Sequence, residues 1–394
     1  MLPHPLNTAS VSPVVPLSAG FLTAVVGFAS SFAVVLQGLE AVGASPVQAA
    51  SGLIALCGIQ GVIMVWLAWR TRMPITIAWS TPGAALLVAT GLPDGGFAAA
   101  VGAFLTAALL ILLAGVWRPF GRAVEAIPAS LASAMLAGVL LELCLAPVRA
   151  IEAMPWHALP IILVWALALR VARLYAVPLA VVVTAAVVGF ATPVPEGAFD
   201  NAWPTLTFVM PTVTLDATIG IALPLFIVTM ASQNIPGLAV LHANGYHPAP
   251  GPLFVATGGA SVISALFGGH MLNLAAITAA LCAGPDAHPD PARRYQASIT
   301  AGVMYVLIAL LAGAAAAFVA ASPPLLIQAV AGLALLGSLA GAASKALQNS
   351  DEHIPAIVTF VTTASGLSIL GIGAAFWGLI AGGAMLALIK LKRP

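Results

Sequence analysis

The sequence predicts an all-α polytopic membrane protein with 14 transmembrane segments in two inverted repeats of seven. Three observations lead to this class. Of the 394 residues, 61% are hydrophobic and 6% are charged, whereas an ordinary soluble protein has about 25% charged residues. The apolar stretches are long, as membrane helices require, and not short and alternating as in membrane barrels. The distribution of Lys and Arg along the chain also favours 14 spans over smaller numbers.

Hydropathy identifies fourteen candidate spans in order along the chain. They are residues 17–40, 46–68, 74–91, 96–117, 124–147, 156–171, 175–192, 216–238, 252–268, 270–283, 296–320, 323–344, 354–368 and 370–389. Several of these stretches are shorter than the roughly 20 residues that a full span needs. Hydropathy alone therefore allows between 11 and 14 helices.

The basic residues choose among these counts. With a cytoplasmic N-terminus and 14 spans, 12 of the 13 basic residues lie in cytoplasmic loops or in the C-terminal tail. These twelve are Arg70, Arg72, Arg118, Arg122, Arg170, Arg173, Arg293, Arg294, Lys345, Lys390, Lys392 and Arg393. Arg149 is the exception. The positive-inside rule therefore favours 14 spans with both termini cytoplasmic.

Fourteen spans divide into two halves of seven. Residues 1–192 hold spans 1–7, and residues 216–394 hold spans 8–14. The polar, proline-containing stretch 193–215 between them is predicted to be a periplasmic linker. Because each half has an odd number of spans, the second is inserted upside down, as in many secondary transporters.

The third span begins unlike a membrane helix. Residues 75–87 read ITIAWSTPGAALL, and their first part favours a strand because it is β-branched and aromatic. A helix is then predicted to start, with Ser80 or Thr81 as N-cap and Pro82 at the first helical position. Irregular backbone at this depth is tolerated only where protein or a water-filled cavity satisfies it.

The tenth span, which matches the third in the second half, is interrupted in the same way. Residues 268–282 read GGHMLNLAAITAALC, in which helix-favouring residues follow a start that does not favour helix. Interruptions at matching positions of two repeats point to a transporter binding site. We expect two short antiparallel strands that pair at the midplane, each followed by a half-helix. The two helix N-termini would then form an anion site without Arg or Lys, because every basic residue lies in a loop or at a span end.

Other polar residues within spans are candidates for the same site. Gln37 lies in the first span, and Ser232, Gln233 and Asn234 lie in the eighth, just before Pro236, which removes a backbone donor. The alternative is that such groups only join helices, at about 0.6 kcal/mol each.

The ionisable groups within spans are few. His270 is either a site residue or a histidine at the end of a loop. Glu40 and Glu142 lie near span ends, where they either carry protons or reach the interface.

Several classes of function lack their sequence signals. A net charge of +1 without a basic cluster gives no indication of nucleic-acid binding. Cys57, Cys144 and Cys282 are isolated in apolar segments, as packing residues are, and no metal site or cofactor is predicted. No HExxH motif, paired catalytic carboxylates or Ser-His-Asp set indicates an enzyme.

At STPGAALL, MASQNIPG, LAAITAALC and ASGLSILGIGAAFWGLIAGG (364–383), the chain resembles the benzoate membrane transporter (BenE) family over essentially its whole length. The family is similar in architecture to nucleobase and sulfate/anion transporters. The resemblance implies a core domain of spans 1–4 and 8–11, about 17–117 and 216–320. It also implies a gate domain of spans 5–7 and 12–14, about 124–192 and 323–389.

The resemblance further implies proton-coupled uptake of benzoate across the bacterial inner membrane. Similar transporters often form homodimers within the lipid bilayer. The implied substrate-binding residues are Gln37, Trp79, Ser80, Thr81, Gly83, Ser232, Gln233, Asn234, His270, Met271, Leu272 and Asn273. Trp79 would provide an aromatic wall. Nucleobase relatives have carboxylates in spans 8 and 10, where this chain has Ser232, Gln233 and His270.

Three questions stay open at this point. The alternative function is an anion channel or an uncoupled carboxylate uniporter on the same scaffold. Neither the preferred aromatic acid nor the proton carrier is fixed, and His270, Glu40 and Glu142 are the candidates for the carrier.

Overall fold

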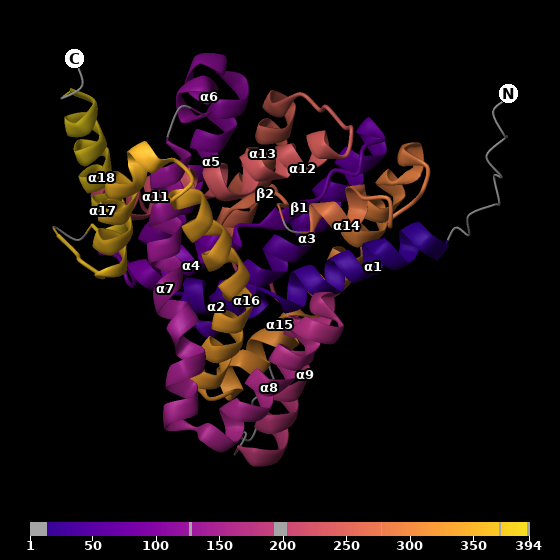
Figure 1. The fold of residues 1–394 in the computed structure, drawn as a ribbon. Helices are drawn as coiled ribbons and strands as arrows, with labels where there is room; N and C mark the ends of the chain where they lie inside the picture. The colour runs from indigo at the N-terminus through magenta and orange to yellow at the C-terminus, as the bar shows by residue number, and fades with distance from the viewer. Residues whose placement is uncertain (1–13, 126–127, 193–202, 277, 370–371, 392–394) are drawn as a thin grey trace, which may run out of the picture.

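The computed structural model describes residues 14–125, 128–192, 203–276, 278–369 and 372–391. Residues 193–202 of the expected linker and both chain ends therefore lie outside the described residues. Figure 1 shows a helical molecule with two short strands near its middle.

The first half contains nine α-helices, one strand and one 3-10 turn in its described part. They are α1 (Val14–Ala29), α2 (Phe32–Ala41), α3 (Pro46–Thr71), β1 (Ile77–Trp79), α4 (Thr81–Thr90), α5 (Gly96–Val116), α6 (Arg118–Glu125), α7 (Ala129–Ala153), α8 (Pro155–Val171), η1 (Arg173–Tyr175) and α9 (Ala176–Ala191).

The second half contains more short irregular turns than the first. Its elements are α10 (Leu215–Ala217), η2 (Thr218–Ala222), α11 (Leu223–Thr229), η3 (Met230–Asn234), α12 (Ile235–Ala243), α13 (Pro250–Leu266), β2 (Leu272–Leu274), α14 (Ala279–Ala283), η4 (Pro291–Arg293), α15 (Tyr295–Ala321), α16 (Pro324–Ala346), η5 (Ser350–Glu352), α17 (His353–Ala364) and α18 (Ala374–Leu391). The turns η2 and η3 are π-helical.

Every range in which the sequence predicts a span contains at least one helix. Within the described residues, nine helical segments are long and apolar enough to cross a membrane. Among the other ranges, α4 and α8 are shorter apolar helices of 10 and 17 residues. The chain is therefore a polytopic helical membrane protein.

The first span is broken in the middle, although its sequence predicts one helix over 17–40. Helix α1 ends at Ala29, and α2 starts at Phe32 after the pair Ser30 and Ser31. Both serine hydroxyls donate to the carbonyl of Gly27, each over 3.1 Å. Serine side chains that compete for backbone groups in this way are a common cause of helix interruption.

The two strands lie where the third and tenth spans are predicted to be extended. β1 and β2 pair antiparallel, with Ile77 opposite Leu274 and Trp79 opposite Leu272. The amide of Ser80 donates to the carbonyl of Met271, which extends the ladder by one bond. Gly268 adopts a φ of +85°, a left-handed conformation that glycine permits, between the end of α13 and β2.

The helices that follow these strands differ in length. Helix α4 has 10 residues, with Ser80 as its N-cap, and α14 has five residues and no side-chain cap. The expected pair of half-helices is therefore unequal. Helix α4 packs against α2.

Packing joins the two halves through long helix pairs. α3 packs along α15, α5 along α13 and α7 along α16. A large apolar core includes residues from both strands, and a smaller separate cluster joins α7, α8, α9 and α16. In Figure 1, α8 and α9 extend away from the strands towards the end of the molecule opposite α6.

Candidate functional site

A cavity of about 650 Å³ lies between the crossing strands and the helices of the smaller cluster. One wall comes from α1, the break at Ser30 and Ser31, both crossing segments, η3 and α15. The opposite wall comes from α8, η1, α9 and α16. Small-molecule sites have volumes of roughly 300–1,000 Å³ and mostly apolar walls with a few polar groups, and this cavity fits that description.

The strand side of the cavity has an aromatic surface built around Trp79. The Trp79 ring is 3% exposed and makes edge contacts with Phe28 and Tyr305, with ring centroids 6.1 and 5.9 Å away. Its indole N–H donates to Ser31 Oγ over 2.8 Å, which fixes the ring against the break in the first span. Trp79 and Tyr305 both line the cavity, so an aromatic ligand would meet rings in edge or stacked geometry.

Uncharged polar groups line the same side. The residues are Ser30 and Ser31 at the break, Thr81 at the start of α4, Gln233 on η3 and Thr278 before α14. Gln233 belongs to the π-turn η3, which ends two residues before Pro236, whose missing amide removes a regular α-helical bond. Single π-turns of this kind frequently mark functional positions in helices. The hydroxyls of Ser30 and Ser31 already donate to the Gly27 carbonyl. The hydroxyls of Thr81 and Thr278 and the amide of Gln233 can donate hydrogen bonds to a ligand.

Three of the twelve predicted substrate-binding residues line this cavity: Trp79, Thr81 and Gln233. Ser80 lies directly behind them and is fully buried. Its hydroxyl accepts from the Gly83 amide over 3.1 Å and from the Thr229 hydroxyl over 3.0 Å. Its carbonyl accepts from His270 Nε2 over 3.0 Å. Ser80 therefore connects α4, α11 and the tenth span.

His270, Met271, Leu272 and Asn273 are all buried behind the cavity wall. Because the Ser80 carbonyl can only accept, the proton of the His270 ring is on Nε2. Its Nδ1 has no hydrogen-bond partner among the described residues. In the amide orientation that pairs donors with acceptors, Asn273 accepts from the Ser80 amide over 2.9 Å. This group holds the crossing strands together.

The other predicted residues do not line the cavity either. Asn234 is buried, and its Oδ1 accepts from the Leu274 amide over 2.9 Å, which fixes β2. The Ser232 hydroxyl donates to the Val228 carbonyl of its own helix. A Cβ on Gly83 would lie 2.6 Å from Leu225 Cδ1, so this glycine permits close packing. Gln37 does not line the cavity, and its buried Oε1 has no partner within the described residues.

The two acidic candidates for proton coupling lie outside the cavity. Glu40 is exposed near the C-terminal end of α2. Glu142 forms an ion pair with Arg149, and the two side chains are 64% and 53% exposed. Exposed pairs of this kind contribute little to stability.

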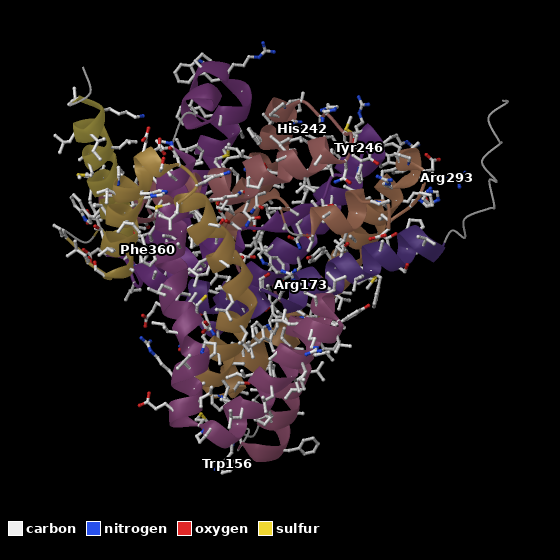
Figure 2. The ribbon with its side chains drawn as sticks, viewed as in Figure 1. Trp156, Arg173, His242, Tyr246, Arg293 and Phe360 are labelled. Carbon is white, nitrogen blue, oxygen red and sulfur yellow. The ribbon has the colours of Figure 1, made fainter. Side chains whose placement is uncertain are left out.

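The opposite wall contains a cation, contrary to the expectation that no arginine reaches the site. Arg173, on the short turn η1 between α8 and α9, lines the cavity together with Trp165 and Leu169 of α8. Figure 2 shows Arg173 near the middle of the molecule, far from Trp156 at the other end of α8. The sequence places Arg173 correctly at a span end, but a span end can face an internal cavity when neighbouring helices extend past it.

Sequence reasoning missed several lining residues. Ser30, Ser31, Trp165, Arg173, Thr278 and Tyr305 line the cavity without having been predicted. The adjacent serines within an apolar helix are a detectable signal for the break. For Trp165 and Tyr305 the sequence offers no signal, because which face of an apolar span points inward depends on tertiary packing.

Two solved structures have a similar fold and low sequence identity to this chain. SLC26A9 aligns with a TM-score of 0.64 and 12% identity, over 96% of this chain and 65% of that chain. The transmembrane domain of the cyanobacterial bicarbonate transporter BicA aligns with a TM-score of 0.57 and 15% identity, over 95% of this chain and 96% of that domain. The chain thus spans about two thirds of SLC26A9. At this identity the likeness shows the fold alone.

Sequence comparison gives a closer relationship. Inner membrane protein YdcO of Escherichia coli (strain K12) is 40% identical over 382 residues, 95% of this chain and 96% of that protein. The benzoate membrane transport protein of Acinetobacter baylyi is 34% identical over 379 residues, 95% of each chain. The family model for benzoate membrane transport proteins (BenE) matches residues 10–388. The chain therefore belongs to the BenE family of membrane transport proteins.

Proposed function

We propose that the protein is a secondary active transporter that takes up benzoate or a similar aromatic carboxylate together with protons by alternating access. The substrate would bind in the cavity between the crossing strands and α8, η1, α9 and α16. The observation that carries the proposal is this cavity, which combines an aromatic surface at Trp79 and Tyr305 with hydroxyl and amide donors.

The chemistry of the cavity suits an aromatic carboxylate. A benzene ring gains from contact with Trp79, Tyr305 and Trp165, because aromatic pairs add about 0.5–1.5 kcal/mol beyond the burial of their area. A carboxylate needs several hydrogen-bond donors when it leaves water. Thr81 and Gln233 provide such donors beside the N-terminus of α4, where the helix dipole also favours negative charge.

The packing pattern supports the proposed inverted repeat of seven spans. If span n of the first half corresponds to span n + 7, the contact of α3 with α15 corresponds to that of α13 with α5. In the pairs β1–β2 and α7–α16, the two members come from corresponding spans, so each pair maps onto itself when the halves are exchanged. Antiparallel strands from matching spans are what a two-fold axis in the membrane plane requires.

The same contacts support the proposed core and gate domains. The smaller apolar cluster of α7, α8, α9 and α16 gives the gate side its own packing. The cavity lies between this cluster and the crossing strands, so a movement of gate against core would change its access.

Location and proton coupling belong to the proposal as well. An E. coli relative is named an inner membrane protein, and we place this chain in the bacterial inner membrane with both termini cytoplasmic. Among the three candidates for proton coupling we favour His270, because its ring donates to the carbonyl of Ser80, which lies between the lining residues Trp79 and Thr81 in the chain.

The test is uptake of labelled benzoate into proteoliposomes with and without an inward proton gradient. We expect saturable accumulation that requires the gradient. Gradient-independent uptake would instead favour an uncoupled uniporter or a channel. Trp79→Ala and Gln233→Ala should each weaken benzoate binding about tenfold, from lost aromatic and hydrogen-bond contacts.

Two matched variants serve as controls. Trp66 is 49% exposed and does not line the cavity, so Trp66→Ala should leave uptake unchanged. Ser232 is adjacent to Gln233 but bonds to its own helix, so Ser232→Ala should also have little effect. Wild-type uptake by both Trp79→Ala and Gln233→Ala would show that the substrate binds elsewhere.

A further inference from the structure

We propose that Arg173 is the cation that selects the carboxylate, and that it does so from the gate side of the cavity. The inference rests on the proposed function, because it names the group that would bind the charge of the substrate. Among the described residues that line the cavity, Arg173 alone carries a formal charge. Arg170, one turn earlier, does not line it.

The hairpin of α8 and α9 directs Arg173 to the site. Trp165 and Leu169 are four residues apart on α8, so they lie on one helix face, and both line the cavity. Helix α8 ends at Val171, and η1 then places Arg173 as the next cavity residue after Leu169. The hairpin thus presents an apolar aromatic face that ends in a guanidinium group, which matches the ring and the carboxylate of benzoate.

The guanidinium of Arg173 is available for a ligand. Within the described part of the chain it forms no ion pair, whereas Arg149 pairs with Glu142 and Arg293 with Asp290. The cavity lining described in the structure contains no Asp or Glu. A positively charged site without its own counter-ion favours an anionic ligand over a neutral one of the same shape. Arginine also binds carboxylates through two parallel hydrogen bonds, which lysine cannot do.

The position of Arg173 divides recognition between two parts of the molecule. Trp79, Thr81 and Gln233 line the cavity from the first crossing segment and η3, where they would contact the ring and one side of the carboxylate. Arg173 lines it from the hairpin. Selection for charge would therefore depend on the hairpin, and selection for the ring on the strands.

The experiment measures equilibrium binding of labelled benzoate to purified protein in detergent, with unlabelled benzamide as the neutral competitor of similar shape. We expect Arg173→Gln to weaken benzoate binding about tenfold or more, as the loss of a hydrogen bond to a charged group implies. The same variant should change benzamide binding less than about twofold. Arg173→Lys should bind benzoate with intermediate affinity, and Arg170→Gln is the matched control, expected to bind as the wild type does.

Two results would overturn the inference while leaving the proposed function intact. One is wild-type benzoate affinity in Arg173→Gln, and the other is an equal loss in Arg170→Gln, which would indicate general surface charge. If Arg173→Gln does not fold, Arg173→Met takes its place, because it keeps a long side chain without the charge, and unchanged benzoate affinity in that variant overturns the inference. If the wild type binds no benzoate, the proposed function fails and the inference fails with it.

Discussion

The two crossing segments, β1–α4 and β2–α14, each consist of a short strand followed by a helix but are stabilised differently. In the first, the strand passes into a 10-residue helix through a complete N-cap: Ser80 Oγ accepts from the Gly83 amide, and Pro82 is in the first turn. In the second, Thr278 makes no capping bond and the helix has five residues. The longer helix, α4, thus has a capping hydrogen bond at its N-terminus, and the shorter helix, α14, has none.

The second crossing is held through its strand. Ser261 Oγ accepts from the Leu272 amide over 2.9 Å, and Asn234 Oδ1 accepts from the Leu274 amide over the same distance. These bonds give partners to the two backbone amides of β2 that do not bond to β1. The stability of the first crossing therefore depends on the N-cap of α4, and that of the second on side chains from α13 and η3. Substitutions in each crossing can measure these two contributions separately.

The largest effect is expected for Gly237→Ala, which acts on the second crossing. A Cβ at Gly237 would lie 2.7 Å from Leu274 Cβ and 2.9 Å from the Ala275 carbonyl, so α12 and β2 must move apart. Overpacking of this kind costs about 1–3 kcal/mol. The thermal unfolding midpoint in detergent should fall, and benzoate binding should be lost.

Gly259→Ala is the matched control for this variant. Gly259 lies in α13, and a Cβ there has no neighbour within 4 Å among the described residues. The midpoint should stay or rise slightly, because alanine favours helix by about 1 kcal/mol. Equal midpoints for the two variants would contradict the close contact between α12 and β2.

Asn234→Ala should have the next largest effect. It leaves the buried Leu274 amide without an acceptor, at a cost of about 1–3 kcal/mol. Asn234→Asp keeps the acceptor oxygen and should bind benzoate better than Asn234→Ala does. The thermal unfolding midpoint and the benzoate affinity should be measured for both variants. A stable, fully active Asn234→Ala protein would show that β2 does not need this bond.

The sequence predicts this part of the fold well where local chemistry decides. The β-branched and aromatic run at 75–79 predicts β1, and Ser80 with Pro82 predicts the start of α4. The unequal partner at 279–283 is harder to foresee, because AAITAALC favours helix by composition alone. Thr278 at its N-cap position is a residue type that can cap a helix, but it makes no capping bond there.

The cavity is less predictable, because tertiary packing brings its walls together. Trp79, Thr81 and Gln233 could be found from the interrupted segments. Asn234 and His270 are polar residues of the same segments, but they bond to backbone groups behind the wall. Arg173 has one local signal, a loop of a few residues between two apolar spans, and that signal does not say what the loop faces.

Ser80→Ala tests the first crossing and should have a moderate effect. Loss of the N-cap costs about 0.5–2 kcal/mol, because the Gly83 amide loses its acceptor. The Thr229 hydroxyl, which donates to Ser80 Oγ, also loses its partner. Thr229→Val removes the second bond alone and serves as the control. A midpoint for Ser80→Ala no lower than that for Thr229→Val would mean that the cap adds no stability.

Thr278→Val should change stability least and therefore separates a capping role from a binding role. Thr278 occupies the N-cap position of α14 without a capping bond, so the change should shift the free energy of unfolding by less than about 0.5 kcal/mol. Its hydroxyl nevertheless belongs to a residue that lines the cavity. If this hydroxyl donates to the carboxylate, benzoate affinity should fall about two- to tenfold. Ser80→Ala would then act mainly by lowering the stability of the protein, whereas Thr278→Val would lower only its affinity for benzoate. A fall in stability comparable to that of Ser80→Ala would show that the two helix starts are capped alike after all.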